Sequence, residues 1–332
     1  MVGKFYPMKR RVRLFFVILF TIVAIRSIGQ DRSGITGVRD STYTRVGEFK
    51  RLLRYHPDIR LVEAADNSEL ISRDVTYRVI DGIQLVGDFY HSVEREERSP
   101  GILIIHGGGW RSGDKEQLGA LADQLALAGY SSFAINYRLS TQALYPAAVC
   151  DVKAALRWMR LNADSLGIDP GKIVALGFSA GGQLAALVGT TAGSSVFSGH
   201  CSAAGDDGVQ AIVDIDGILA FIHPESGEGD DSDSKSAASY WFGYTKAERP
   251  DLWYEASALT HVSEKTPPTL FINSAADRMH AGRDDFIRVL DRWTIYHETK
   301  VFRDAPHSFC LFDPWFTPMV GAVVNFLNTV FE

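Results

Sequence analysis

The sequence has few cysteines, no long apolar run and no basic tract beyond its first residues. Its 332 residues include three cysteines, Cys150, Cys201 and Cys310, which are too few and too scattered for a metal ribbon or a disulfide scaffold. They allow at most one bridge, whose pairing the sequence leaves open. The net charge is −6 and no Lys/Arg-rich stripe is present, so we expect no nucleic-acid partner.

What is present is the composition of a folded domain. Hydrophobic residues make up 46% of the chain and charged residues 22%, which excludes a disordered or collagen-like protein. The apolar content is sufficient for a large core. The length fits one generous α/β domain or two small ones, and we find no internal repeat.

The first 29 residues have the pattern of a secretory signal. Five basic residues and no acid precede Leu14, twelve mostly apolar residues run to Ile25, and small residues follow at Ser27 and Gly29. A membrane-spanning helix needs roughly 20 apolar residues, so this run is short for an anchor, although an uncleaved anchor is the alternative. No cysteine follows the run to accept a lipid.

Cleavage after this signal would change the charge of the chain. Residues 1–29 carry six positive charges and no negative ones, so the mature chain would carry −12 instead of −6. We therefore expect an acidic protein that is secreted or periplasmic, without stable membrane insertion once the signal is removed.

We expect the rest of the chain to form one α/β domain, residues 72–332. A polar N-terminal extension, residues 30–71, precedes it and contains an amphipathic stretch at 46–55. Residues 75–80 and 83–90 flank an Asp81-Gly82 turn and predict a β-hairpin. Apolar runs without alternation, separated by helices, then predict parallel strands buried on both faces. The expected strands are 102–105, 132–136, 173–176, 211–215, 269–272 and 299–302, and the expected helices 116–128, 146–163, 179–190, 284–292 and 315–330. Residues 218–264 form a long insertion with an acidic loop at 225–235, and insertions of this length are often lids.

The first motif with chemical meaning is Gly177-Phe-Ser179-Ala-Gly181, between an expected strand and an expected helix. This is the Gly-x-Ser-x-Gly pattern of a sharp turn that presents a nucleophilic serine at a helix N-terminus. A plain serine N-cap is the structural alternative. The strand–turn–helix setting favours Ser179 as a nucleophile.

The second motif is His106-Gly-Gly-Gly-Trp110, directly after the strand 102–105. Glycines allow backbone N–H groups to approach the oxyanion of a tetrahedral intermediate. We expect donors from Gly108 and Gly109, joined by the N–H of Ala180, and a loop-bracing role for His106. The spacing does not fit a nucleotide-binding loop, so no nucleotide cofactor is expected.

The third motif is a pair of loops after the last two strands. A serine nucleophile needs a histidine base and an acid that orients it. His307 follows the strand 299–302 and Asp277 follows the strand 269–272, which gives the chain order serine, acid, histidine. We therefore expect Asp277 as the acid and His307 as the base. His280 and His261 are the other candidate bases, and Asp284, Asp285 and Asp304 the other candidate acids.

Together with residues 136–140, 145–148 and 257–262, these motifs resemble the α/β-hydrolase superfamily over residues 72–332. Within it the chain looks like esterases with a His-Gly-Gly-Gly oxyanion loop, near hormone-sensitive lipases and exported bacterial carbohydrate esterases. The resemblance implies a mostly parallel sheet with helices on both faces and a serine esterase without metal or cofactor. Two segments depart from the common pattern: residues 213–217 are more acidic, and residues 308–316 are more aromatic.

The substrate is expected to be an ester on plant cell-wall polysaccharide or its oligosaccharides. Aromatic rings stack on sugars, and an arginine can bind a uronate carboxylate, so we expect substrate contacts from Trp110, Arg278, Trp241 and Phe309. Arg111 and Arg283 also lie in or beside the site loops. Packing of the insertion onto the body is the alternative role of its aromatic residues.

An acetyl ester is the first choice, with pectin methylester and feruloyl ester as alternatives on the same scaffold. A peptidase or a lipase is the next class of enzyme. A catalytically idle relative that binds carbohydrate is the non-enzymatic alternative.

The signal-peptide expectation predicts a shortened chain. Mass spectrometry of the protein from its native host should find the mature N-terminus near Gly29. A chain that retains Met1 or Lys4 would contradict this expectation and favour the anchor.

Overall fold

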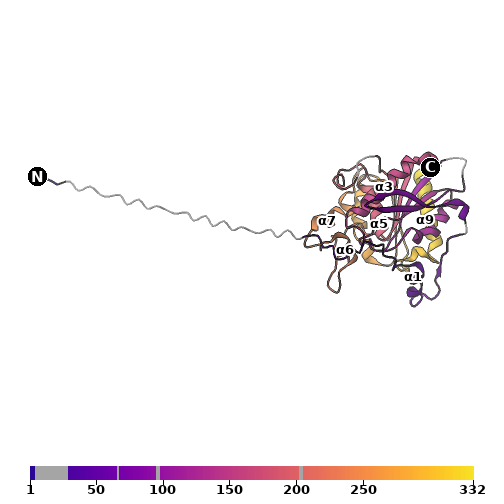
Figure 1. Ribbon diagram of the computed structural model, residues 1–332, viewed down its shortest axis with the longest axis horizontal. Helices are drawn as coiled ribbons and strands as arrows, with labels where there is room; N and C mark the ends of the chain where they lie inside the picture. Colours follow the sequence, from indigo (N-terminus) through magenta and orange to yellow (C-terminus); the bar gives the residue numbers. More distant parts are fainter. Residues whose placement is uncertain (4–28, 66, 95–97, 202–204) are drawn as a thin grey trace.

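The computed structural model describes residues 1–3, 29–65, 67–94, 98–201 and 205–332 (Figure 1). The expected signal peptide falls almost entirely on residues 4–28, outside the described residues. Among the described helices, none is both long and apolar enough to cross a membrane.

A mostly parallel sheet forms the centre of the described chain. It contains eight strands in the order β2-β3-β5-β4-β6-β7-β8-β9. The hairpin β2–β3 is antiparallel and pairs antiparallel with β5, and all further pairs are parallel. The strands are β2 (Ile71–Ile80), β3 (Ile83–Tyr90), β4 (Ser99–Ile105), β5 (Ser131–Ile135), β6 (Ile168–Phe178), β7 (Ala211–Ile215), β8 (Thr269–Asn273) and β9 (His297–Val301).

Helices cover both faces of this sheet because its central strands are apolar on both sides. Ile102 and Ile104 of β4 pack in one core with α2 and α9, whereas Leu103 and Ile105 pack in the other with α3 and α5. Figure 1 labels α3, α5 and α9 around the strands. The helices are α1 (Arg45–Leu52), α2 (Gly119–Leu127), α3 (Ala147–Leu161), α4 (Ala163–Leu166), α5 (Ala180–Thr190), α6 (Ala237–Phe242), α7 (Pro250–Glu255), α8 (Arg283–Arg292) and α9 (Phe316–Phe331).

The register of the parallel strands brings several loops to one edge of the sheet. Ile105 of β4 pairs with Gly177 of β6, and Ile215 of β7 pairs with Phe178 on one side and Ile272 on the other. The carboxyl ends of these strands are therefore level. The loops that follow them meet at the edge where open α/β sheets bind their ligands.

The N-terminal segment is attached to the loop that follows β9. The two-residue strand β1 (Arg60–Leu61) pairs antiparallel with β10 (Phe312–Asp313), and α1 precedes β1. A disulfide joins Cys150 of α3 to Cys201, while Cys310 is a buried free thiol. The segment between β7 and β8 contains α6 and α7, whose Phe242 and Trp253 rings lie 4.3 Å apart.

The expected α/β architecture is confirmed. The hairpin, the parallel strands and the long helices lie where the apolar pattern indicated them, with β6 beginning five residues earlier than the apolar run. The turn at Asp81 and Gly82 has positive φ at both residues, as a two-residue hairpin requires. The very short elements α6, α7, β1 and β10 had no clear periodic signal.

Candidate active site

Ser179 occupies a strained turn between β6 and α5. Its φ is 56° and its ψ −120°, a combination that is unusual for a residue with a side chain. A Cβ on Gly177 would lie 2.0 Å from the carbonyl oxygen of Gly181, and one on Gly181 would lie 2.0 Å from that of Ile105. The two glycines of the motif are therefore required by the close approach of β6, α5 and the end of β4.

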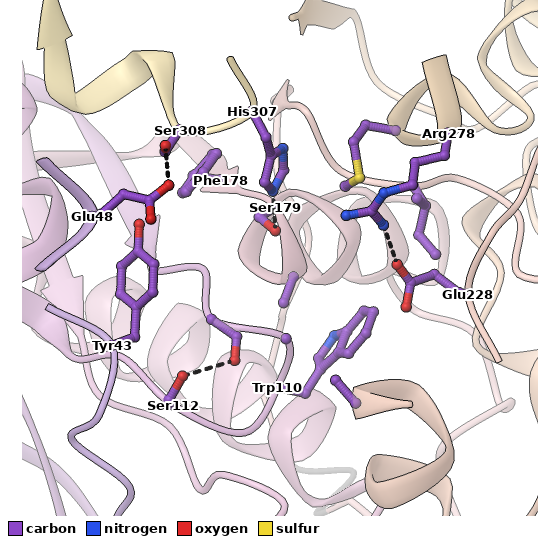
Figure 2. A pocket seen from close by; sticks show the side chains of 16 residues that line it. Tyr43, Glu48, Trp110, Ser112, Phe178, Ser179, Glu228, Arg278, His307 and Ser308 are labelled. Carbon is purple, nitrogen blue, oxygen red and sulfur yellow. Dashed lines mark hydrogen bonds and ion pairs between the residues drawn. The ribbon is translucent and has the colours of Figure 1, made fainter. Parts of the chain in front are cut away.

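His307 lies in the loop after β9 and contacts the serine directly (Figure 2). Its Nε2 is 2.9 Å from Oγ of Ser179, and its Nδ1 is 2.8 Å from Oδ2 of Asp216. A carboxylate only accepts, so Nδ1 carries the proton and Nε2 is free to accept the serine hydroxyl proton. The structure thus brings Ser179 and His307 together as the motifs predicted.

The carboxylate at His307 belongs to Asp216 at the end of β7, a residue that we did not include among the candidate acids. Asp216 is fully buried and has a φ of 52°. It also accepts hydrogen bonds from the backbone N–H of Ser274, at 2.8 Å, and from the Ser274 hydroxyl. These donors come from the residue that follows β8, so the acid is held between two neighbouring strand ends.

The expectation that Asp277 is the acid is wrong. Asp277 is exposed in a short 3₁₀ helix and lines a separate cavity with Glu225, His280, Arg283 and Asp284. Physically, Ser274 already occupies the position directly after β8 and turns its donors toward Asp216. The available signal was the unusually acidic segment at residues 213–217, where Asp216 directly follows a buried strand.

A second buried carboxylate lies two residues before Asp216. The pKa of Asp214 is raised well above its usual range, chiefly by burial and in smaller part by the charge of Asp216. Its Oδ1 accepts the N–H of Gly217 at 2.9 Å. Burial and the neighbouring Asp216 charge therefore disfavour the charged form of Asp214.

The glycine loop after β4 borders the same site. Gly108 and Gly109 have positive φ values of 118° and 59°. Both glycines line the cavity at Ser179, as does Ala180. Ala180 is the first residue of α5, so its N–H has no partner within the helix.

His106 braces this loop from behind, as expected. Its Nδ1–H donates to the Gly107 carbonyl oxygen at 2.7 Å, and its Nε2 accepts from Arg39 at 2.9 Å. Its ring stacks on Tyr137 at 4.4 Å. Burial, together with the charge of Arg39, lowers the pKa of His106 well below its usual value, so the ring stays neutral and is not placed to carry a proton to substrate.

A cavity of about 300 Å³ opens in front of Ser179. Of the four expected substrate contacts, Trp110 and Arg278 line it, and Arg278 pairs with Glu228 at 2.8 Å (Figure 2). The full lining is Tyr43, Glu48, Gly108, Gly109, Trp110, Ser112, Phe178, Ser179, Ala180, Ile218, Glu228, Ala237, Arg278, Met279, His307 and Ser308.

Trp241 and Phe309 do not line this cavity, so those two expected contacts are wrong. Trp241 is fully buried and stacks behind Trp110 at 4.9 Å, and Phe309 is fully buried against Phe302. The rings instead pack the insertion and the loop after β9 onto the body, which is the alternative that large aromatic side chains usually follow. Trp110 is fixed further by donating its indole N–H to Gln183 of α5 at 2.9 Å.

The described residues contain no cluster of three or more histidine, cysteine, aspartate or glutamate side chains that could hold a metal ion.

The chain is similar to curated proteins that are named as esterases. "Esterase LipC" of Mycobacterium tuberculosis is 30% identical over 247 residues, which cover 70% of this chain and 59% of that protein. The chain spans about half the length of the curated relatives that it matches.

Solved structures show the same fold. A truncated carbohydrate esterase from gut microbiota aligns with a TM-score of 0.64 at 23% identity, covering 80% of this chain and 100% of that one. The acetyl ester-xyloside bifunctional hydrolase of Caldicellulosiruptor lactoaceticus aligns with a TM-score of 0.61 at 24% identity, covering 74% and 88%. The family model described as BD-FAE matches residues 88–281, which include Ser179, Asp216 and the glycine loop. The chain has the α/β-hydrolase fold and belongs to the BD-FAE family.

Proposed function

We propose that this protein is an exported serine esterase that removes short acyl groups, acetyl first, from plant cell-wall polysaccharides or their oligosaccharides. The observation that carries the proposal is the continuous chain of hydrogen bonds from Ser179 through His307 to Asp216, with a glycine loop beside the serine. A binding protein would have no use for a histidine held between a serine hydroxyl and a buried carboxylate. The proposal is also supported by similar proteins and structures that are named as esterases.

In the proposed reaction, His307 takes the proton of Ser179 while Oγ attacks the ester carbonyl carbon. The carbonyl oxygen becomes an oxyanion, which the backbone N–H groups of Gly108, Gly109 and Ala180, all residues of the cavity lining, would stabilise. Asp216 keeps the imidazole in the Nδ1–H tautomer and stabilises its positive charge.

Collapse of this intermediate breaks the bond between the carbonyl carbon and the alcohol oxygen. His307 gives its proton to that oxygen, the alcohol leaves, and the acyl group remains on Ser179. Water then gives a proton to His307 and attacks the acyl carbon. The bond from that carbon to Oγ of Ser179 breaks, His307 returns its proton to Oγ, and the carboxylic acid leaves.

The cavity supports a short acyl group and an uncharged sugar. Its volume of about 300 Å³ is at the lower end for ligand pockets. Arg111 lies over the Tyr240 ring outside the cavity lining, with its buried Nη1 lacking a hydrogen-bond partner among the described residues. Arg278, which lines the cavity, already pairs with Glu228, and Arg283 binds Asp284 and Asn273. This occupancy favours an acetyl ester over a methyl ester of uronate, whose neighbouring carboxylates would need a cation.

Export is supported by the N-terminal sequence and by the disulfide. The basic head and apolar run of residues 1–29 fit a signal peptide. The bridge between Cys150 and Cys201 ties the loop after α5 to α3, and such bridges persist mainly in oxidising compartments.

The role of Asp216 as the acid is tested by replacing its carboxylate with an amide. Asp216→Asn should lower kcat by about 10⁴-fold, because the amide would favour the wrong imidazole tautomer and remove the charge that stabilises the imidazolium. Asp277→Asn is the matched control and should keep most of its activity, since Asp277 is exposed and lines another cavity. Hydrolysis of p-nitrophenyl acetate measures both. The reverse order of effects would return the role to Asp277.

The ester is tested by the products. The wild-type protein should release acetate from acetylated xylan and no methanol from methylated, acetylated pectin. Ser179→Ala should lose roughly 10⁶-fold in kcat with the fold intact, because only a hydroxyl is removed. Methanol without acetate would overturn the choice of ester, and activity of Ser179→Ala near the wild-type level would overturn the serine mechanism.

A further inference from the structure

The cavity at Ser179 has one polar wall that the proposed reaction does not yet use. Figure 2 shows Tyr43, Glu48 and Ser308 on one side of His307, and Trp110 with the Arg278–Glu228 pair on the other. Tyr43 precedes α1 and Glu48 lies within it, so the N-terminal segment supplies part of the cavity lining.

Glu48 is held by hydrogen bonds that stabilise its charged form. Its Oε1 accepts the Ser308 hydroxyl at 2.6 Å, and Arg51 donates to Oε1 and Oε2 at 2.6 and 2.7 Å. Burial opposes ionisation, but the hydrogen bonds from Arg51 and Ser308 and the charge of His307 outweigh it, so the pKa of Glu48 is lowered.

This carboxylate still has room for one more donor. A carboxylate offers about four lone-pair sites, and the three hydrogen bonds above leave one on Oε2. The hydroxyl of Tyr43 points toward Glu48 in Figure 2 and provides a second polar group at the same wall. The hydrogen bonds among the described residues therefore leave an acceptor site on Oε2 of a side chain that lines the cavity and binds the neighbour of the proposed base through its other oxygen.

The position of Glu48 on the His307 side of the cavity determines which half of the ester it would contact, the alcohol half or the acyl half. His307 must give its proton to the leaving oxygen, so the alcohol half of the substrate lies against His307 and its neighbour Ser308. Trp110, Ile218 and Met279 supply apolar lining that suits the acyl half. When the alcohol half is a sugar, it carries further hydroxyl groups close to the ester oxygen, whereas a simple alcohol carries none.

We propose that Glu48 is a specificity-determining residue that accepts a hydrogen bond from a free hydroxyl of the leaving sugar, with Tyr43 beside it. This assignment rests on the proposed esterase function and adds the feature of the substrate that is recognised: a hydroxyl next to the acylated position. Partly acetylated sugars are then better substrates than fully substituted ones.

The test pairs a change in the protein with a change in the substrate. Glu48→Gln keeps the shape and an acceptor for Ser308 but removes the charge. The two substrates are a monoacetylated methyl xyloside and the same compound with its remaining hydroxyls methylated. Tyr43→Phe is the second variant, and Glu63→Gln, an exposed acid on the same N-terminal segment, is the control.

We expect Glu48→Gln to lower the ratio of kcat/KM for the free-hydroxyl substrate to kcat/KM for the methylated substrate by roughly 10-fold or more. This is the loss typical of a hydrogen bond to a charged group. Tyr43→Phe should shift the same ratio in the same direction, and Glu63→Gln should leave both rates as they are.

Equal losses on the two substrates, accompanied by a shifted pH profile, would mean that Glu48 acts only by positioning His307 and would overturn the assignment. Unchanged rates on both would overturn it as well. If the wild-type protein hydrolysed neither xyloside nor p-nitrophenyl acetate, the proposed esterase function itself would be contradicted, and the role of Glu48 with it.

Discussion

The hydrogen bond between Asp216 and His307 joins parts of the chain that are 91 residues apart and sets the geometry of the whole site. A buried carboxylate is costly unless it is paired and hydrogen-bonded. Here the partners are the imidazole Nδ1–H and the backbone N–H and hydroxyl of Ser274. The end of β7, the end of β8 and the loop after β9 are thereby tied together, with Nε2 of His307 directed at Ser179.

The surrounding structure keeps this arrangement in register. Level pairing of Ile215 with Phe178 and Ile272 brings Ser179, Asp216 and Ser274 to one edge of the sheet. On the far side of His307, Ser308 is bound by Glu48 of α1, and β10 pairs with β1. The N-terminal segment therefore helps to hold the loop of the base as well as lining the cavity.

Local patterns predicted much of this molecule, because their information lies within a few residues. The run of residues 173–176, the glycines at positions 177 and 181, and the hairpin turn at Asp81 each specify backbone geometry by near neighbours. The position of His307 after the last expected strand predicts its role as the base. These features follow from sterics and from the burial of apolar strands.

The remaining features depend on contacts that are distant in sequence. Asp216 and Asp277 both follow strands, and only the pairing of β7 with β8 decides which carboxylate faces His307. The acidic segment at residues 213–217 was the one local sign. Likewise, the number of aromatic residues could not separate Trp110, which lines the cavity, from Trp241, which is buried behind it. The contact of α1 with the loop of His307 has no local signature, since β1 and β10 contain two residues each.

We propose that Asp216, acting through His307, makes Ser179 a reactive nucleophile. The most direct measurement is the rate at which a fluorophosphonate probe labels the protein, with the modified residue located by peptide mass spectrometry. We expect a single adduct on Ser179 that forms rapidly in the wild type and in Asp277→Asn, and far more slowly in Asp216→Asn. Rapid labelling of Asp216→Asn, or an adduct on another serine of the folded protein, would contradict it.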